Sequence, residues 1–508
     1  MELFRFITRY QFKMNTVFAQ GFGLSISLGG GLITCRTQSQ QPSNFYTGSE
    51  QTMRSRTASL VTLLLMSCFI PVASAQNEAL DWLMEYLAID TVNPPGNEIR
   101  GVEFFADIFD AEGVAYETAE SAPGRGNIWA RLEGGDEPAL ILLHHIDVVP
   151  ASEEFWDSDP LVPVIRDGLI IGRGVADTKG LGILHLQAFL NLHRNNIRLN
   201  RDVIFMATAD EEAGGFFGAG WLIENRPEIF ENVGFVLNEL TEPTLMENGT
   251  IQVGIEVAQK RPFWLRLVSE DIPGHGSAPR ITSATTRLVA ALDRIREQPF
   301  EPQVSDPVRS MFEQLAPFED PRWQTAMANI DEAVQDPGFL RDFQEERPAL
   351  HALLRNTCSL TMLSGSDKIN VVPPTASAEM DCRILPEQDA NEFLDQLRER
   401  IADEQIEIEQ IMLFGPASSS ADTELFASMT RVLQERMPGA NVFPSVLQAF
   451  TDSHFFRDLG IVAYGFGPVV IPDGFSSNFH GNNERIPLEG FIQGEQIMNA
   501  VVRDFVEE

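Results

Sequence analysis

The feature that most constrains this chain is a regular alternation of strand-like and helix-like segments over residues 78–250. Short apolar, β-branched runs, which are typical of buried strands, alternate with segments of helical periodicity. We expect strands at 127–132, 139–143, 202–207 and 234–237, and helices at 77–87 and 180–191. This order predicts an α/β domain with a mainly parallel sheet and helices on both faces.

The pattern changes near residue 252, where strand-like segments become more frequent. Strands are expected at 251–257, 263–268, 359–363, 377–384 and 406–413, and helices at 283–297 and 390–401. Residues 299–356 are rich in Pro and predict short helices joined by turns. The α/β pattern then resumes, with helices at 424–436 and 488–506 and a strand at 461–465. We therefore expect one domain formed by residues 78–252 and 414–508, with an α+β domain of residues 253–413 inserted into it.

The first 76 residues have a different character from the rest of the chain. Two arginines follow Met53, an apolar stretch runs from 60 to 72, and Ala73-Ser74-Ala75 offers a cleavage site of small residues. This arrangement predicts a signal peptide at 53–75, with residues 1–52 as an upstream extension. The protein is then periplasmic or secreted, with no membrane span after cleavage. A retained anchor at 60–72 is the less favoured alternative.

Charge and cysteine content restrict the partners and the covalent structure. The formal net charge of -36 disfavours nucleic acid and anionic lipid as partners, because both are polyanions. Cys358 and Cys382 are the cysteines that remain after the predicted cleavage, and both lie in strand-like runs. They form either a disulfide between neighbouring strands or two buried thiols, and the sequence slightly favours the thiols.

Histidine and carboxylate side chains that suit a metal site occur where strands end or turns begin. His145 and Asp147 are two apart on a predicted strand end, so both point the same way. Asp147 is therefore expected to hydrogen-bond the far imidazole nitrogen of His145 and to fix its tautomer. Asp177 lies in a glycine-rich turn before a predicted helix, where an aspartate is alone more typical of a helix cap.

Two adjacent acids, Glu211 and Glu212, stand between an apolar strand and the turn Gly214-Gly215. One carboxylate of such a pair can bind metal while its neighbour faces a substrate water. With His145, Asp177 and the distant His480, the pair predicts a site for two divalent ions with one carboxylate left free as a base.

The ordered motifs resemble those of the aminoacylase/carboxypeptidase family of di-zinc metallopeptidases. The motifs are HxDVVP at His145, GRGxxDxKG at Asp177, ADEExGG at Glu211, Asn238-Glu239, Gly274-His275-Gly276-Ser277, Asn370-Val371-Val372-Pro373, Asp381-Cys382-Arg383, Thr451-Asp452 and His480-Gly481-Asn482-Asn483-Glu484. The resemblance runs from about residue 78 to 508. The long segment 299–356 is more similar to the Gly-Xaa carboxypeptidase and N-acyl amino acid hydrolase branch than to the compact deacylases.

The resemblance implies a role for each of these positions. Asp177 would bridge two ions, one also held by His145 and Glu239 and the other by Glu212 and His480. Glu211 would be the general base, with Asp147 supporting the catalytic site. The substrate's carbonyl and carboxylate would be contacted by His275, Asn370 and Arg383. Glu239 departs from the family pattern, because Leu240-Thr241 follows it instead of Gly-Gly.

The resemblance also implies an activity and its cofactors. The expected protein is a metal-dependent hydrolase that cleaves an amide or peptide bond next to a free C-terminal carboxylate. Zn²⁺ is the favoured metal, with Co²⁺ or Mn²⁺ as alternatives. The inserted domain would be a lid that allows a homodimer, in which His275 reaches the partner's site. The alternatives are a deacylase of an N-acylated biosynthetic amino acid and a catalytically silent binding protein on the same fold.

Overall fold

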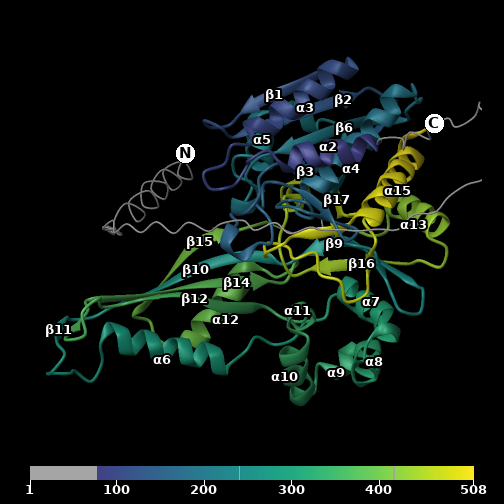
Figure 1. Cartoon of the computed structure of the whole chain (residues 1–508). Coiled ribbons are helices and arrows are strands. Elements are labelled where there is room, and N and C mark those ends of the chain that lie inside the picture. The colour runs from purple at the N-terminus through teal and green to yellow at the C-terminus, as the bar shows by residue number, and fades with distance from the viewer. Residues whose placement is uncertain (1–76, 240, 416–417) are drawn as a thin grey trace, which may run out of the picture. The chain divides into compact units, whose positions relative to one another are not determined.

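The structure is a computed structural model, and it describes residues 77–508 except 240 and 416–417. The predicted signal peptide and upstream extension lie outside these described residues. Within them, the chain forms a large mixed sheet, a separate four-stranded sheet and a series of short helices (Figure 1).

The large sheet has ten strands in the order β1-β2-β6-β3-β7-β17-β9-β8-β18, with β16 paired to β9. The centre of the sheet is parallel, because neighbouring strands pair in parallel in the order β6, β3, β7 and β17. The flanking pairs are antiparallel: β1–β2, β2–β6, β17–β9 and β8–β9. The strands are β1 (Tyr116–Glu120), β2 (Gly126–Leu132), β3 (Glu137–His145), β6 (Arg201–Thr208), β7 (Val233–Asn238), β8 (Thr244–Leu245), β9 (Ile251–Gln259), β16 (Asn441–Leu447), β17 (Val462–Gly465) and β18 (Ile471–Pro472).

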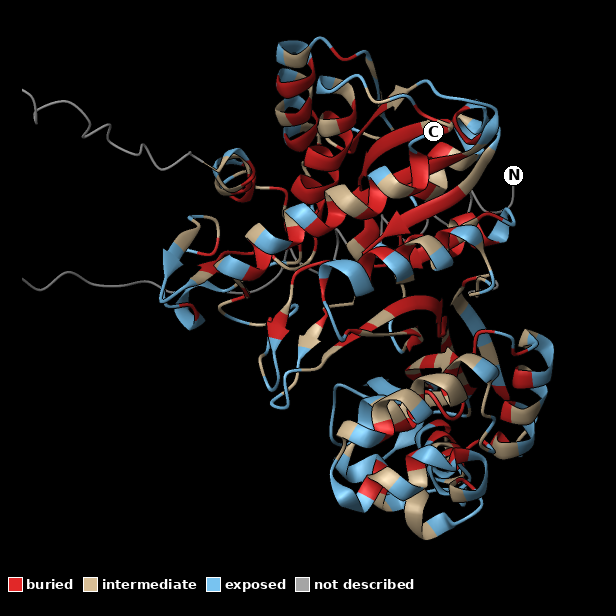
Figure 2. Ribbon diagram, turned by 90° about the vertical axis from the view of Figure 1, so that its right-hand side faces the viewer, coloured by how far each residue is buried: buried red, intermediate tan, exposed pale blue. Residues whose placement is uncertain are grey.

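Helices cover both faces of this sheet, as the sequence predicts. Successive residues of β3 point to opposite faces, so Leu140 and Leu142 join one buried cluster, whereas Ile141 and Leu143 join another. The first face carries α2 (Glu78–Leu87), α3 (Ile99–Glu112), α4 (Lys179–Arg194), α13 (Glu424–Arg436) and α15 (Leu488–Val506). The second carries α5 (Ala219–Asn225) and α14 (Ser453–Asp458). Because both faces are covered, the central strands are almost wholly buried (Figure 2).

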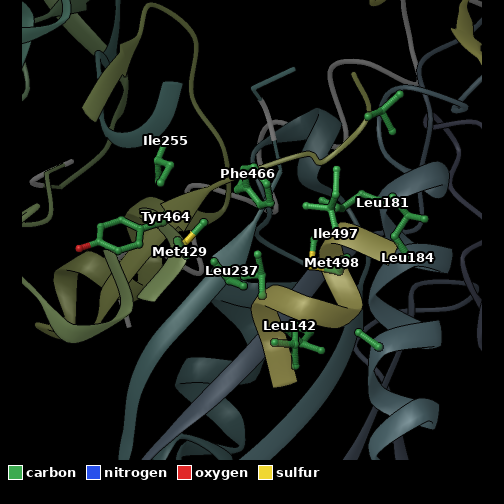
Figure 3. Packing of buried hydrophobic residues seen from close by; sticks show 14 of the residues in the cluster. Leu142, Leu181, Leu184, Leu237, Ile255, Met429, Tyr464, Phe466, Ile497 and Met498 are labelled. Carbon is green, nitrogen blue, oxygen red and sulfur yellow. The ribbon is translucent and has the colours of Figure 1, made fainter. Parts of the chain in front are cut away.

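The first face holds the larger part of the core. Leu142 of β3, Leu237 of β7 and Met498 of α15 gather where α15 crosses the sheet (Figure 3). All three side chains are fully buried, and burying each removes a leucine-sized apolar surface from water. This packing fixes the carboxyl ends of the central strands, where polar side chains follow.

The four-stranded sheet is antiparallel throughout, in the order β12-β14-β10-β15. Its strands are β10 (Arg261–Glu270), β12 (Thr357–Ser364), β14 (Thr375–Ile384) and β15 (Ile406–Leu413). One face packs on α6 (Ala284–Glu297) and α12 (Ala390–Ile401) around a core of its own that includes Phe263, Leu288 and Phe393. This α+β unit follows the predicted elements, and the domain limits 78–252, 253–413 and 414–508 remain a prediction.

Cys358 and Cys382 form a disulfide, so the slight preference for two free thiols was wrong. The two cysteines are directly opposed in the antiparallel pair of β12 and β14. Opposed residues in such a pair have adjacent Cβ atoms, which brings both sulfur atoms within bonding distance. The register that creates this proximity depends on the whole sheet and is not readable from the spacing of the cysteines.

Five short helices occupy most of the proline-rich segment, as predicted. They are α7 (Asp306–Leu315), α8 (Pro321–Ala328), α9 (Ile330–Ala333), α10 (Pro337–Glu346) and α11 (Pro348–Ala352). Four of them carry Pro in the first turn, where its missing N–H costs no hydrogen bond. Their buried side chains, such as Phe312 and Phe343, belong to the core of the large sheet, and α7 packs against β16.

A single residue, Lys260, separates β9 of the large sheet from β10 of the small one. Its fully buried ammonium donates to the carbonyls of Ala352 and Arg355, both at 2.8 Å, and to Thr357 Oγ1 at 2.9 Å. The end of the helical segment is therefore fastened to the point where the chain passes between the sheets. Within residues 77–508 that are described, no helix is both long and apolar enough to cross a membrane.

Candidate active site

The predicted metal ligands meet at the carboxyl ends of the central parallel strands. His145 ends β3, Glu211 and Glu212 lie in a short 3-10 helix after β6, and Glu239 directly follows β7. Asp177 stands in the turn before α4, and His480 lies in the loop between β18 and β19 (Arg485–Pro487). Open α/β sheets bind ligands at this edge, because the loops that follow the strands converge there.

Asp177 lies between the two histidines and offers one oxygen to each. His145 Nε2 is 3.0 Å from Asp177 Oδ1, and His480 Nε2 is 3.1 Å from Asp177 Oδ2. A carboxylate that faces two separate imidazole nitrogens has the geometry of a bridge between two metal ions. The helix-cap interpretation of Asp177 therefore does not account for its position.

The remaining acids divide between the two histidines. Glu239 Oε2 is 3.4 Å from His145 Nε2, whereas Glu212 Oε2 is 3.0 Å from His480 Nε2. Glu211 Oε2 is more distant, 4.0 Å from His145 Nε2. Two groups of side chains have ligand atoms within 4.8 Å of one another: His145, Asp177 and Glu212, and His145, Glu211 and Glu239. The departure from Gly-Gly after Glu239 does not remove its carboxylate from the cluster.

The electrostatics of the cluster fit divalent cations. Burial and repulsion from Asp177 raise the pKa of Glu212 to about 7, and burial together with Glu239 raises the pKa of Glu211 well above its ordinary value. Hydrogen bonds to Asp177 and Glu212 raise the pKa of His480 to about 10. So many buried carboxylates are stable together only with protons or cations among them, and a mixed nitrogen and oxygen donor set suits Zn²⁺ and similar ions.

Asp147 connects His145 to the acidic pair, although through different atoms from those expected. Its backbone carbonyl accepts the His145 Nδ1 hydrogen bond at 2.9 Å, while its carboxylate lies 3.5 Å from that nitrogen. The carboxylate instead accepts the backbone N–H groups of Glu211 (3.1 Å) and Glu212 (3.2 Å), and an Asn93 side-chain N–H at 2.8 Å. Asp147 thus leaves His145 Nε2 facing the cluster and also sets the position of both glutamates.

Glu484 is a second supporting residue, and the sequence motif that contains it predicts no role for it. It is fully buried, and its carboxylate accepts the backbone N–H groups of Gly174 (2.9 Å), Ala176 (2.8 Å) and Asp177 (3.1 Å). Arg173 pairs with it at 2.7 Å and also donates to the Gly481 carbonyl at 2.9 Å. The Arg173–Glu484 pair therefore holds the turn of Asp177 and the loop of His480 together.

Another buried arginine supports the acidic turn from its other side. Arg125 forms ion pairs with Asp210 at 2.6 Å and with Glu98 at 2.8 Å. Asp210 has φ of 73°, in the left-handed region, and its second oxygen accepts the Phe217 N–H at 3.0 Å. These bonds stabilise the turn that presents Glu211 and Glu212, and no local sequence signal identifies Arg125 as their source.

Two of the predicted substrate contacts do not meet the cluster within the chain. His275 lies in β11 (Gly274–His275), which pairs with β13 (Val371–Val372) at the far end of the four-stranded sheet (Figure 1). The His275 side chain is exposed, and Ser277 N–H donates to its Nδ1 at 3.2 Å. Asn370 is exposed beside it, and its carbonyl accepts the Gly276 N–H at 2.9 Å.

Arg383, the third predicted substrate contact, lies in β14 and is half-buried. Its Nε donates to Asp381 at 2.7 Å, and its guanidinium lies 5.2 Å from the ring centre of Phe450. Phe450 is two residues before Asp452, a buried acid that accepts a hydrogen bond from Thr208 at 3.3 Å, at the end of β6. One nitrogen, Arg383 Nη1, is buried with no hydrogen-bond partner among the described residues.

This fold and this cluster define a class: an α/β hydrolytic enzyme with a two-metal type of site at the ends of parallel strands. A family model described as "Peptidase family M20/M25/M40" matches residues 141–504. The chain belongs to this peptidase family and is a hydrolase.

Named relatives agree with this assignment. "N-fatty-acyl-amino acid synthase/hydrolase PM20D1" of Xenopus tropicalis is 33% identical over 372 residues, which cover 71% of each chain. "Aminoacylase-1" of Homo sapiens is 27% identical over 429 residues, 82% of this chain and 93% of the relative.

Solved structures share the fold. An M20 family metallo-carboxypeptidase from Sulfolobus solfataricus superposes with a TM-score of 0.66 at 18% identity, covering 84% of this chain and 99% of that one. Human carnosine dipeptidase 1 gives a TM-score of 0.58 at 18% identity, with 85% and 97% covered.

Proposed function

We propose that this protein hydrolyses the amide bond of N-acyl amino acids or short peptides that carry a free C-terminal carboxylate. The observation that carries the proposal is the position of Asp177 between His145 and His480, with Glu211 farther from His145 Nε2, at 4.0 Å, than Asp177 is, at 3.0 Å. Such an arrangement leaves one buried carboxylate free to handle a proton beside a pair of cations.

The side chains present suit two ions, for which Zn²⁺ is the first candidate and Co²⁺ or Mn²⁺ are alternatives. One ion would be held by His145, Asp177 and Glu239, and the other by Asp177, Glu212 and His480. The pair would polarise the scissile carbonyl and acidify the attacking water. His145 Nε2 lies close to Asp177 and Glu239, and His480 Nε2 lies close to Asp177 and Glu212. These distances support this division of the ligands.

Glu211 would accept a proton from the water while the oxygen of that water attacks the carbonyl carbon of the substrate. The same carboxylic acid would then deliver that proton to the nitrogen as the C–N bond breaks, which releases an amine and a carboxylate. Its buried position and raised pKa suit both halves of this transfer. Arg383 Nη1, which has no hydrogen-bond partner in the described part of the chain, would receive the substrate's C-terminal carboxylate.

His275 and Asn370 would act on the carbonyl oxygen from a second copy of the chain. Their place at the far end of the four-stranded sheet leaves them exposed and free to reach a neighbour. The homodimer is thus part of the proposal, because the site lacks these donors within one chain.

The proposed substrate class follows the names of the relatives. PM20D1 is named as an N-fatty-acyl-amino acid synthase/hydrolase, and two other similar proteins are named aminoacylase-1 and carnosine dipeptidase 1. We propose an exported enzyme with such substrates, since the Cys358–Cys382 disulfide is typical of oxidising compartments. A deacylase of a biosynthetic intermediate fits export less well, and a silent binding protein has no need of Glu211.

Metal analysis of the purified mature chain, combined with a screen of N-acyl amino acids and dipeptides, tests the proposal. We expect about two metal ions per chain. Glu211→Gln should keep them while kcat falls by about 10²–10⁴-fold. The matched control is Glu435→Gln, which changes an exposed glutamate of α13 and should leave kcat unchanged. Normal turnover by a metal-replete Glu211→Gln variant would reject the assignment of the base.

A further inference from the structure

A second cavity lies away from the metal cluster, between the C-terminal half of α6, strand β12 and helices α10 and α11 (Figure 1). Its volume is about 710 Å³, which lies within the range of about 300–1,000 Å³ typical of small-molecule sites. None of the residues of the acidic cluster lines it. The cavity therefore has no part in the proposed hydrolysis.

Arg355 lines the cavity and is only 7% exposed. Among the residues that the structure describes, no oxygen accepts a hydrogen bond from its guanidinium and no carboxylate forms an ion pair with it. Glu301 is the acidic group that attracts it, but from beyond ion-pair distance. Arginine keeps its charge when buried, and the Nε of Arg355 is removed from water without a hydrogen-bond partner among the described residues.

The other buried arginines show how unusual this is within the same chain. Arg125, Arg173, Arg201 and Arg457 each pair with a carboxylate, and Arg261 donates to two backbone carbonyls. Arg355 is therefore the exception among the buried arginines of the described residues. His351 beside it has a buried Nε2 that also lacks a partner, and burial lowers the pKa of His351 to about 4, so its imidazole is neutral at pH 7.

The rest of the lining is mainly apolar. Leu292, Ile295, Phe300 and Met380 form the inner walls, while Val289 and Leu363 form an outer wall that is 52% and 59% exposed. A buried cation at one place and apolar walls elsewhere are complementary to a carboxylate that carries a hydrocarbon tail. The apolar walls give no reason to prefer a small inorganic anion.

We propose that this cavity binds an aliphatic carboxylate of medium chain length, with its head group on Arg355 and His351 and its tail along α6 and Met380. The planar guanidinium fork suits a carboxylate, and His351 offers a further hydrogen bond. A free fatty acid and an N-acylated amino acid share this chemistry. The site is separate from the metal cluster and does not depend on the proposed reaction.

Isothermal titration of the metal-replete full-length mature protein with decanoate, below its micelle threshold, tests the site. Decanoate has no amide bond and cannot be turned over. We expect a saturable site that is separate from decanoate binding at the metal cluster, with affinity at least about tenfold lower for decanol, because the charged hydrogen bonds are lost. Arg355→Gln should weaken decanoate binding by a similar factor, whereas Arg341→Gln, an exposed arginine of α10, should not. N-Decanoylglycine, tested with the Glu211→Gln variant, separates the two sources of the carboxylate.

A second variant guards against misfolding of Arg355→Gln. Leu363→Glu places a negative charge, like that of the decanoate carboxylate, on the exposed outer wall and should also weaken decanoate binding. Ile369→Glu, at a fully exposed position outside the cavity, should not. Equal binding by wild type, Arg355→Gln and Leu363→Glu would overturn the proposal. So would absence of decanoate binding together with a dimer that Leu363→Glu dissociates, because the cavity would then be an interface between two copies.

Discussion

The carboxylate of Glu484 accepts the backbone N–H of Asp177 at 3.1 Å, although 307 residues separate them. The same oxygen accepts the Ala176 N–H, and the other accepts the Gly174 N–H and pairs with Arg173. A single buried side chain thus accepts the hydrogen bonds of three backbone N–H groups in the turn that presents the proposed bridging carboxylate. The metal site depends on this second layer as much as on its ligands.

Glu484→Gln should therefore weaken metal binding without touching a metal ligand. The amide removes a charge and an acceptor, so Arg173 is left buried and uncompensated. We expect a metal affinity about 10–100-fold lower, and a free energy of unfolding lower by about 3–5 kcal/mol. Competition with a chromophoric chelator and denaturant unfolding measure the two effects, with Glu435→Gln as control. Unchanged affinity in the folded variant would contradict this role.

Asp147→Asn tests the support of the acidic pair. Each carboxylate oxygen of Asp147 accepts one of these N–H groups, and the nitrogen that replaces one oxygen cannot, so either Glu211 or Glu212 loses its acceptor and the turn should loosen. We expect kcat to fall by about 10–100-fold, with both metals still bound at saturating concentration. Asp157→Asn, at an exposed aspartate, is the matched control. The check is to measure kcat for wild type and variant at the same metal occupancy. If kcat is then equal, the variant acts only through loss of metal, and the predicted positioning role is wrong.

Metal uptake should release protons, and the affinity should rise with pH. In the metal-free protein the pKa of His480 is raised to about 10 by Asp177 and Glu212, so its imidazole is protonated at pH 7. Glu212, whose pKa is about 7, is half protonated there. A protonated ligand cannot bind metal, so binding displaces these protons. Calorimetric titration in buffers of different ionisation enthalpy counts them, and identical heats in all buffers would refute the prediction.

Arg383→Ala should act on substrate binding. Its Nη1 has no hydrogen-bond partner within the residues that the structure describes and is expected to hold the substrate's carboxylate, so KM for free-acid substrates should rise by about 10–100-fold. Amidated analogues should be hydrolysed as before. Arg266→Ala is a close control, because Arg266 pairs with Glu379 on the same sheet at a similar exposure. Equal losses on both substrate types would show that Arg383 acts through the fold.

Mixing two inactive variants tests the contribution of His275 from a second copy. Glu211→Gln lacks the base, and His275→Ala lacks the proposed oxyanion donor. In a mixed dimer, one site combines an intact Glu211 with an intact His275 from the partner. Activity should therefore reappear after the variants are unfolded and refolded together, and not after they are refolded separately. If confirmed mixed dimers recover no activity, His275 acts either in the active site of its own chain or in no active site.

Local patterns predicted the central elements because packing and periodicity agree there. The strand expected at 139–143 is β3, and the helix expected at 180–191 is α4, each with a few residues added at the ends. Several elements were not predicted, and for two of them the physical reason is clear. Helix α3 has Glu98 at its N-cap position, and no side-chain hydrogen bond caps it. Strand β16 contains Pro444, which is tolerated because β16 pairs with β9 alone.

Residue types at strand ends and in the turn before α4 were enough to predict the cluster, since His145, Asp177 and Glu212 carry the chemistry themselves. What supports them was harder to predict, because Glu484 and Arg125 act over long sequence separations. The atom that Asp147 uses toward His145 depends on which hydrogen-bond donors surround its carboxylate. Likewise, the pairing of Cys358 and Cys382 follows from strand register, which the whole sheet determines.

The walls of the Arg355 cavity come from two different cores. Helix α6 and strand β12 belong to the four-stranded sheet, whereas α10 and α11 pack with the core of the large sheet. Any rotation of one sheet against the other must widen or narrow the space between them. An occupant would therefore work as a spacer, coupling the angle between the two halves of the enzyme to the supply of its ligand.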